Sequence, residues 1–282
     1  MRSSISQVTS HSTVQSKKQS SWTAHTGRSD IWVGLYSSHV WLALGWHDTK
    51  QRYRRSTLGP FWFTLSTLIM VAVLGGLYST LLRQKISDYL PYLGMGLVTW
   101  GYIAAVVNEG CATFIGSAYL IKQLRMPLSI HVCRVVWRNF VIFLHSLPVI
   151  IIALFWFGHY PKLEFLLLIP GLLILALQGL WIGIVLGLLC ARYRDVVPIV
   201  ANLLQITFFF TPVMWSPEIL KGRAWVAELN PLYHLIQIIR APVLGTAIEL
   251  RSWVWSIGLL LVGLAAAQYL MSRCRDRVAY WL

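Results

Sequence analysis

The sequence predicts an all-α integral membrane protein with six transmembrane helices. The chain is 56% hydrophobic and only 12% charged, whereas an ordinary soluble domain carries about 25% charged residues. The apolar residues stand in blocks of about twenty, the length that crosses roughly 30 Å of hydrocarbon as a helix. Blocks this long lack the alternation of polar and apolar residues that marks the strands of a membrane barrel. Since backbone groups in lipid must form hydrogen bonds within the protein, these segments are expected to be helices.

The six predicted spans contain no Asp, Glu, Lys or Arg. One such residue at a helix centre costs about 2.5 to 3.5 kcal/mol on insertion, so six charge-free windows are hard to explain as buried helices of a soluble protein. The spans are residues 58–82, 89–107, 139–157, 165–191, 196–215 and 252–272.

The N-terminal segment 1–29 is rich in Ser, Thr, Gln and His and lacks the apolar core of a signal peptide. It predicts a disordered cytoplasmic tail. The remaining residues, 30–282, form one predicted transmembrane domain.

A helix lying in the membrane plane is predicted at residues 31–47, which are rich in Trp and Leu. At helical spacing its small residues Gly34, Ser37, Ser38 and Gly45 gather within about 100°. The basic run 50–55 that follows suits lipid headgroups. The alternative is a helix packed within a soluble fold.

Three arginines, Arg52, Arg54 and Arg55, directly precede the first span. They are either topology anchors or guanidinium groups that bind a phosphate-bearing lipid headgroup bidentately. The two roles are compatible, and both remain open.

The connector between the second and third spans contains a short amphipathic piece that ends at a proline. It either docks into a groove of a partner protein as a helix or is a solvated linker. Its candidate docking residues are Lys122, Gln123, Leu124, Arg125 and Met126. Glu109, at the end of the second span, is expected to pair with Lys122, Arg125 or Arg134.

The stretch 216–251 is too polar to span and too apolar for a plain loop. Two short apolar pieces, 224–229 and 232–244, predict a periplasmic re-entrant hairpin between spans five and six. Irregular backbone at membrane depth is tolerated only against protein or a water-filled cavity, so this hairpin is expected to cap a pathway.

Five aromatic residues near this predicted outer face have two interpretations. Aromatic belts at membrane interfaces are ordinary, but aromatic faces also stack against the C–H faces of sugar rings. The residues are Phe208, Phe209, Phe210, Trp215 and Tyr233.

The basic residues predict the orientation. The N-terminal region, the 108–138 loop, the 192–195 turn and the C-terminus hold 17 of the 24 Lys and Arg, which places both termini in the cytoplasm. Because the net charge of +14 is spread between apolar blocks, it does not indicate nucleic-acid binding.

Nucleotide and metal motifs are missing from the sequence. It has no G-x-x-x-x-G-K-[ST] loop and no Cys or His spacing typical of a metal site. An H-x4-D pattern at His25 and Asp30 is the only support for a membrane acyl- or glycosyltransferase, and its position beside the predicted tail favours chance. The sequence therefore predicts no enzyme activity and no cofactor for this chain alone.

Five runs in order resemble the ABC-2 type permeases, and within them the branch that exports O-antigen and capsule polysaccharide. They are RYRRSTLGPFW at 52–62, LIKQLRMPLS at 120–129, ARYRD at 191–195, TPVMW at 211–215, and NPLYH through RAP at 230–242.

This resemblance implies a homodimer in the bacterial inner membrane that carries two separate ATPase subunits, which bind ATP and Mg²⁺. It implies uptake of an undecaprenyl-diphosphate-linked polysaccharide near Arg52, Arg54 and Arg55, coupling to the ATPase through residues 122–126, and a periplasmic gate after Trp215. The alternative is a permease of the same fold that exports a small amphiphile or drug.

Overall fold

The protein, described by a computed structural model, is helical, and the described residues contain no strand. The description covers residues 27–54, 61–124, 126–158, 160, 162–220, 222–223, 225–247 and 249–282, so the predicted tail lies outside it up to residue 26. The helices are α2 (Gly27–Tyr36), α3 (Ser38–Tyr53), α4 (Phe61–Leu81), α5 (Ile86–Gly116), α6 (Ala118–Gln123), α7 (Ser129–Trp156), the short 3₁₀ helix η1 (Leu163–Leu167), α8 (Leu168–Arg192), α9 (Val196–Phe210), η2 (Pro217–Leu220), α10 (Trp225–Glu228), α11 (Pro231–Leu244) and α12 (Leu250–Trp281).

Five of these helices are long and apolar enough to cross a membrane: α4, α5, α7, α8 with η1, and α12. They coincide with five predicted spans, although α5, α7 and α12 extend well beyond the apolar windows, to 31, 28 and 32 residues. The chain is therefore a multi-pass membrane protein.

The helix α9 is shorter than the predicted span 196–215, which stays a prediction. It has 15 residues, a rise of about 22 Å at 1.5 Å per residue, against roughly 30 Å of hydrocarbon. It ends because Thr211, with ψ 135°, precedes Pro212, and a residue before proline disfavours the helical conformation.

The core of the bundle is built around α5, which packs most extensively against α8 and α7 and also contacts α4 and α11. Leu93, Met95 and Phe114 of this helix are completely buried. Since lipid tails are as apolar as these side chains, close packing rather than escape from water holds such a core together.

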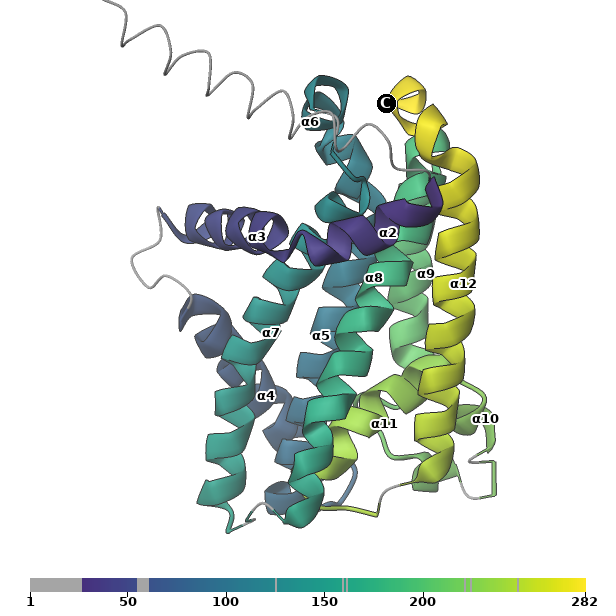
Figure 1. The fold of residues 1–282 in the computed structure, drawn as a ribbon. Helices are drawn as coiled ribbons and strands as arrows, with labels where there is room; N and C mark the ends of the chain where they lie inside the picture. The colour runs from purple at the N-terminus through teal and green to yellow at the C-terminus, as the bar shows by residue number, and fades with distance from the viewer. Residues whose placement is uncertain are drawn as a thin grey trace, which may run out of the picture.

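The predicted in-plane helix 31–47 is helical but consists of two pieces, α2 and α3, which meet at Ser37 and lie across the long helices (Figure 1). Its small residues pack against α7: a Cβ added to Gly34 would lie 2.0 Å from the Ser129 Oγ, and one added to Gly45 would lie 2.8 Å from the Trp137 ring. The face of α2 and α3 that carries these small residues therefore permits their close approach to α7.

The two ends of the bundle differ. One end carries α6, the C-terminus of α12 and, just below them, α2 and α3; we call it the α6 end (Figure 1). The opposite end carries α10, α11 and the start of α5 and α12, and we call it the α11 end.

Candidate functional site

Ion pairs at the α6 end fasten α3 to the bundle. Glu109 of α5 accepts from Arg52 Nη2 of α3 at 2.9 Å, from Arg138 of α7, and from Asn139 Nδ2 at 2.6 Å. The predicted partners Lys122 and Arg134 are wrong, because among the described residues Glu109 pairs with Arg52 and Arg138. The third predicted partner, Arg125, lies outside the described residues.

Asp48 of α3 forms the second attachment. It accepts from Arg134 and, at 3.2 Å, from Arg138 Nη1, both on α7. Arg138 thus bridges Asp48 and Glu109, and because all three side chains are largely shielded from solvent, the attraction between them is screened less than at an open surface.

Asp30 of α2 is completely buried and caps the start of α7. Its carboxylate accepts from the backbone N–H groups of Leu128 and Ser129 at 3.2 and 3.0 Å, which a helix N-terminus would otherwise leave without partners. It also accepts from Arg275 Nε of α12 at 2.8 Å. One carboxylate therefore joins α2, α7 and α12.

The basic run that the sequence singled out lies beside these ion pairs. The side chain of Arg52, in the last turn of α3, is 38% exposed and forms an ion pair with Glu109. Arg54 follows the helix and is exposed, whereas Arg55 lies outside the described residues. An anion that binds Arg52 at Nη2 therefore competes with Glu109.

The candidate docking segment forms the exposed tip of the α6 end (Figure 1). Lys122 and Gln123 end α6, a helix in which no residue is buried, and Leu124 follows at 43% exposure. Met126 is half-buried against the bundle, and Arg125 lies outside the described residues.

At the α11 end, Arg240 is buried to 1% exposure. It donates from Nη1 to the Pro212 carbonyl and from Nη2 to the Val213 carbonyl, both at 3.0 Å, and its guanidinium lies 3.9 Å from the centre of the Tyr92 ring. A Cβ on Gly96 would lie 2.1 Å from Nη2. The guanidinium thus fixes the turn after α9 against α5 and α11.

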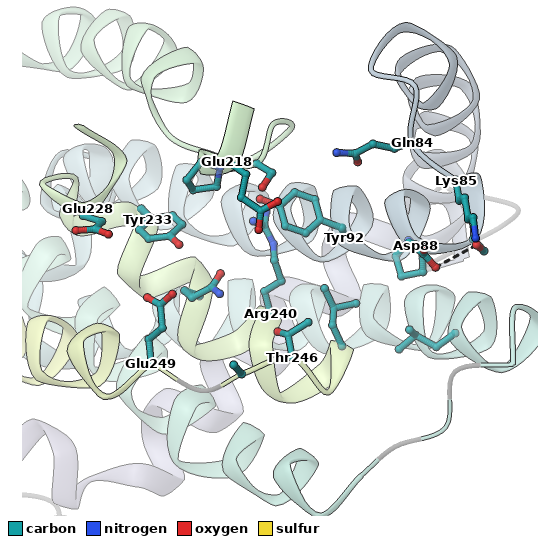
Figure 2. A pocket seen from close by; sticks show the side chains of 18 residues that line it. Gln84, Lys85, Asp88, Tyr92, Glu218, Glu228, Tyr233, Arg240, Thr246 and Glu249 are labelled. Atoms are coloured by element: carbon teal, nitrogen blue, oxygen red, sulfur yellow. Dashed lines mark hydrogen bonds between the residues drawn. The ribbon is translucent and has the colours of Figure 1, made fainter. Parts of the chain in front are cut away.

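A cavity of about 760 Å³ opens beside Arg240 (Figure 2). Its walls come from the start of α5, the segment 216–218, α11 and the start of α12, with Leu154 of α7. Four carboxylates line it together with two phenols, two side-chain amides and two basic groups: Asp88, Glu218, Glu228 and Glu249; Tyr92 and Tyr233; Gln84 and Gln237; Lys85 and Arg240.

Two contacts secure the helices around this cavity. His234 of α11 lies 3.0 Å from Ser252 Oγ of α12 and 2.7 Å from the Glu228 carbonyl of α10. Burial, the largest cause, lowers the pKa of His234, so the imidazole is a neutral hydrogen-bonding group that ties α10, α11 and α12 together.

The structure divides the five aromatic candidates. Phe208, Phe209 and Trp215 line a small cavity of about 150 Å³ with Tyr78, Leu82 and Met214. Tyr233 lines the larger cavity, and Phe210, 70% exposed, lines neither. The aromatic residues thus do not form one surface within the described part of a single chain.

Sequence reasoning missed the roles of Asp30 and Arg240. Asp30 was attributed to a chance pattern, yet it is a buried helix cap; His25 of that pattern lies outside the described residues. For Arg240 the available signal was a charged residue alone in an apolar stretch, because a charge buried there requires partners. Asp30 directly follows the polar tail and gave no such signal.

Comparison with known proteins identifies similar membrane transporters. A family model described as "ABC-2 type transporter" matches residues 39–244. An "O-antigen export system permease protein RfbA" of Klebsiella pneumoniae is 27% identical over 191 residues, 67% of this chain and 74% of that protein. A protein with the same description from Myxococcus xanthus is 27% identical over 203 residues, 71% of this chain and 78% of that protein.

Proposed function

Because the chain belongs to the ABC-2 type transporter family, we propose that it is the membrane permease of an exporter for a polysaccharide linked to undecaprenyl diphosphate. The observation that carries this proposal is the similarity to O-antigen export permeases over two thirds of the chain. An ABC-2 permease is a transport subunit, so the driving ATPase is a separate chain in this proposal.

In the proposed assembly two copies of the chain form the pathway and carry two ATPase subunits in the inner membrane. The α6 end, which holds most of the basic side chains, faces the cytoplasm with both termini. We further propose that the chain has six spans, of which α9 is the shortest. In this arrangement α2 and α3 lie at the membrane interface, and α10 and α11 form a re-entrant hairpin that gates the outer side.

The substrate diphosphate binds in this proposal at Arg52, Arg54 and Arg55. Guanidinium groups pair bidentately with phosphate oxygens, and Arg52 already holds an anionic partner, Glu109, at 2.9 Å. Arg52 contacts one carboxylate oxygen of Glu109, whereas a diphosphate offers several oxygens to the same guanidinium. A diphosphate should therefore compete well with Glu109 for Arg52. Phe208, Phe209, Phe210, Trp215 and Tyr233 would contact the sugar chain further along the pathway.

The function is tested by deleting the gene and identifying what accumulates in the cytoplasm. We expect an undecaprenyl-linked glycan to accumulate and to disappear from the cell surface, with recovery on complementation. Normal surface glycan with increased sensitivity to amphiphilic drugs would instead contradict the proposal. The purified chain alone should hydrolyse no ATP.

The headgroup site is tested with Arg52→Gln and Glu109→Gln. Losing a charge-assisted hydrogen bond costs about 1.5 to 3 kcal/mol, so Arg52→Gln should weaken binding of undecaprenyl diphosphate about tenfold or more. Glu109→Gln removes the competing negative charge and should therefore strengthen the binding of undecaprenyl diphosphate. Equal binding by wild type and both variants would contradict a role for Arg52; Arg83→Gln, at the α11 end, is the control.

A further inference from the structure

We propose that the cavity beside Arg240 binds a neutral or amino sugar unit of the exported glycan and excludes acidic ones. This inference rests on the proposed export function and adds to it a site and a class of sugar. It concerns the α11 end, far from the arginines proposed to bind the diphosphate.

The cavity has the size of a ligand site and its walls are assembled from distant parts of the chain. Its volume of about 760 Å³ falls within the roughly 300 to 1,000 Å³ typical of small-molecule pockets. The lining side chains come from α5, the 216–218 segment, α11 and the start of α12. Figure 2 shows Tyr233 and Glu249 on one side of Arg240, and Tyr92 on the other.

The lining groups match the hydroxyls of a sugar. Carboxylate oxygens of Glu218 and Glu249 accept hydrogen bonds, and the Gln237 amide both donates and accepts. Burial raises the pKa of Tyr233 to about 12, with Glu249 as a further cause, so this phenol keeps its proton and can donate.

Several of these groups have unused hydrogen-bonding capacity. Glu228 is paired with Arg251, but no described residue donates to Glu218. The Nε of Arg240 is buried and has no acceptor within the described part of the chain, although its two other nitrogens do. A buried donor without an acceptor is unfavourable, and because this atom has no accessible surface, a ligand oxygen could accept from it only after the guanidinium shifts.

The charge of the walls selects among sugars. The lining carboxylates are Asp88, Glu218, Glu228 and Glu249, and the lining basic groups are Lys85 and Arg240. With Arg251, which pairs with Glu228, three basic groups stand against four acidic ones, so a uronic acid would still meet an excess of like charge. A divalent cation fits less well, because no three metal-ligating side chains of the described residues gather closely enough to hold one.

The inference is tested on the full-length chain in lipid nanodiscs with three trisaccharides: maltotriose, chitotriose with free amines, and trigalacturonate. Binding is followed by saturation-transfer NMR and titration. We expect saturable binding of the first two and at least tenfold weaker binding of the acidic one.

The variant Glu218→Gln/Glu249→Gln should bind maltotriose several-fold more weakly and discriminate less against trigalacturonate. Asp195→Asn, an exposed acid on the turn between α8 and α9, should change neither. Binding of all three sugars with equal strength, of no sugar, or of spermidine or Mg²⁺ in their place overturns the inference.

These outcomes separate the inference from the export function. If glycan accumulates in the deletion strain but the purified chain binds no sugar here, the cavity assignment fails alone. If no glycan accumulates, the export function itself fails, whatever the trisaccharides do.

Discussion

At the scale of single residues, two buried charges are held in different ways. Asp30 accepts from two backbone N–H groups and from Arg275, whereas Arg240 donates to two backbone carbonyls. Removing one partner of a buried charged pair leaves the other charge uncompensated, at a cost of about 3 to 5 kcal/mol. Both residues are therefore sensitive points of the fold.

Replacing Asp30 with Ala should destabilise the protein by about 3 kcal/mol, because Arg275 and the start of α7 both lose their acceptor. Thermal unfolding of the detergent-purified chain measures the effect. Asp276→Ala is the matched control, since that neighbouring carboxylate is 96% exposed and 4.0 Å from Arg275. Equal stability of the two variants would contradict a structural role for Asp30.

Replacing Gly96 with Ala should lower stability by about 1 to 3 kcal/mol, the usual effect of overpacking. The new methyl group would lie 2.1 Å from Arg240 Nη2 and 2.4 Å from the Val213 carbonyl. Gly101→Ala on the same helix has nothing within 4 Å and should be neutral or slightly stabilising. The same unfolding measurement compares the two variants, and a neutral Gly96→Ala would mean that both the guanidinium and the Val213 carbonyl shift freely.

At the scale of secondary-structure elements, α6 and α9 differ from the other described α-helices because neither contains a buried residue. A helix of six residues is too short to be stable by itself in water, so α6 is held by its neighbours α5 and α12. Its exposed end can change without disturbing the core.

We expect Lys122→Glu with Leu124→Ala to reduce co-purification of the ATPase about tenfold, the effect of losing roughly 1.4 kcal/mol of binding. Thermal stability should stay unchanged, because these side chains are exposed. Arg83→Glu, in the exposed turn after α4 at the opposite end, tests whether any charge reversal has this effect. Full recovery of the ATPase with the double variant would exclude α6 as the docking element.

The helices could be predicted from the sequence, but their ends and their contacts could not. The apolar segments of the sequence located α4, α5, α7, α8 and α12. A charged residue ends such an apolar segment but not the helix, whose backbone hydrogen bonds continue beyond it. The stretch 108–138 was therefore treated as a loop, although α5 runs to Gly116 and α7 begins at Ser129.

The pairing of Glu109 was unpredictable for a related reason. Its partner Arg52 lies 57 residues away in the sequence, and its other partner, Arg138, reaches it only because α7 starts early. Similarly, the sequence placed Tyr233 among the aromatic residues but gave no sign of the carboxylates around it, because the cavity is assembled from four separate segments.

At the scale of the whole molecule, the two ends have opposite character. The α6 end carries ion pairs that hold helices together, and the α11 end carries an acidic cavity. In the proposed topology, with the α6 end toward the cytoplasm, this cavity would face outward.

Cysteine labelling in intact cells checks this orientation. In a Cys274→Ser background, whose other cysteines Cys111, Cys133 and Cys190 are buried, Glu218→Cys should react with a membrane-impermeant maleimide from outside. Lys122→Cys should react only after the inner membrane is permeabilised. The reverse pattern would invert the proposed topology and turn the cavity toward the cytoplasm.

The contact between Asp30 and Arg275 also has a consequence for biosynthesis. The two residues are 245 positions apart, so the ribosome delivers the carboxylate long before the arginine, and α12 must be inserted before the cap of α7 is complete. Until α12 is inserted, the Asp30 carboxylate can accept from the backbone N–H groups at the start of α7 but has no contact with Arg275. A nascent chain arrested before α12 should therefore hold α2 more loosely than the finished protein does.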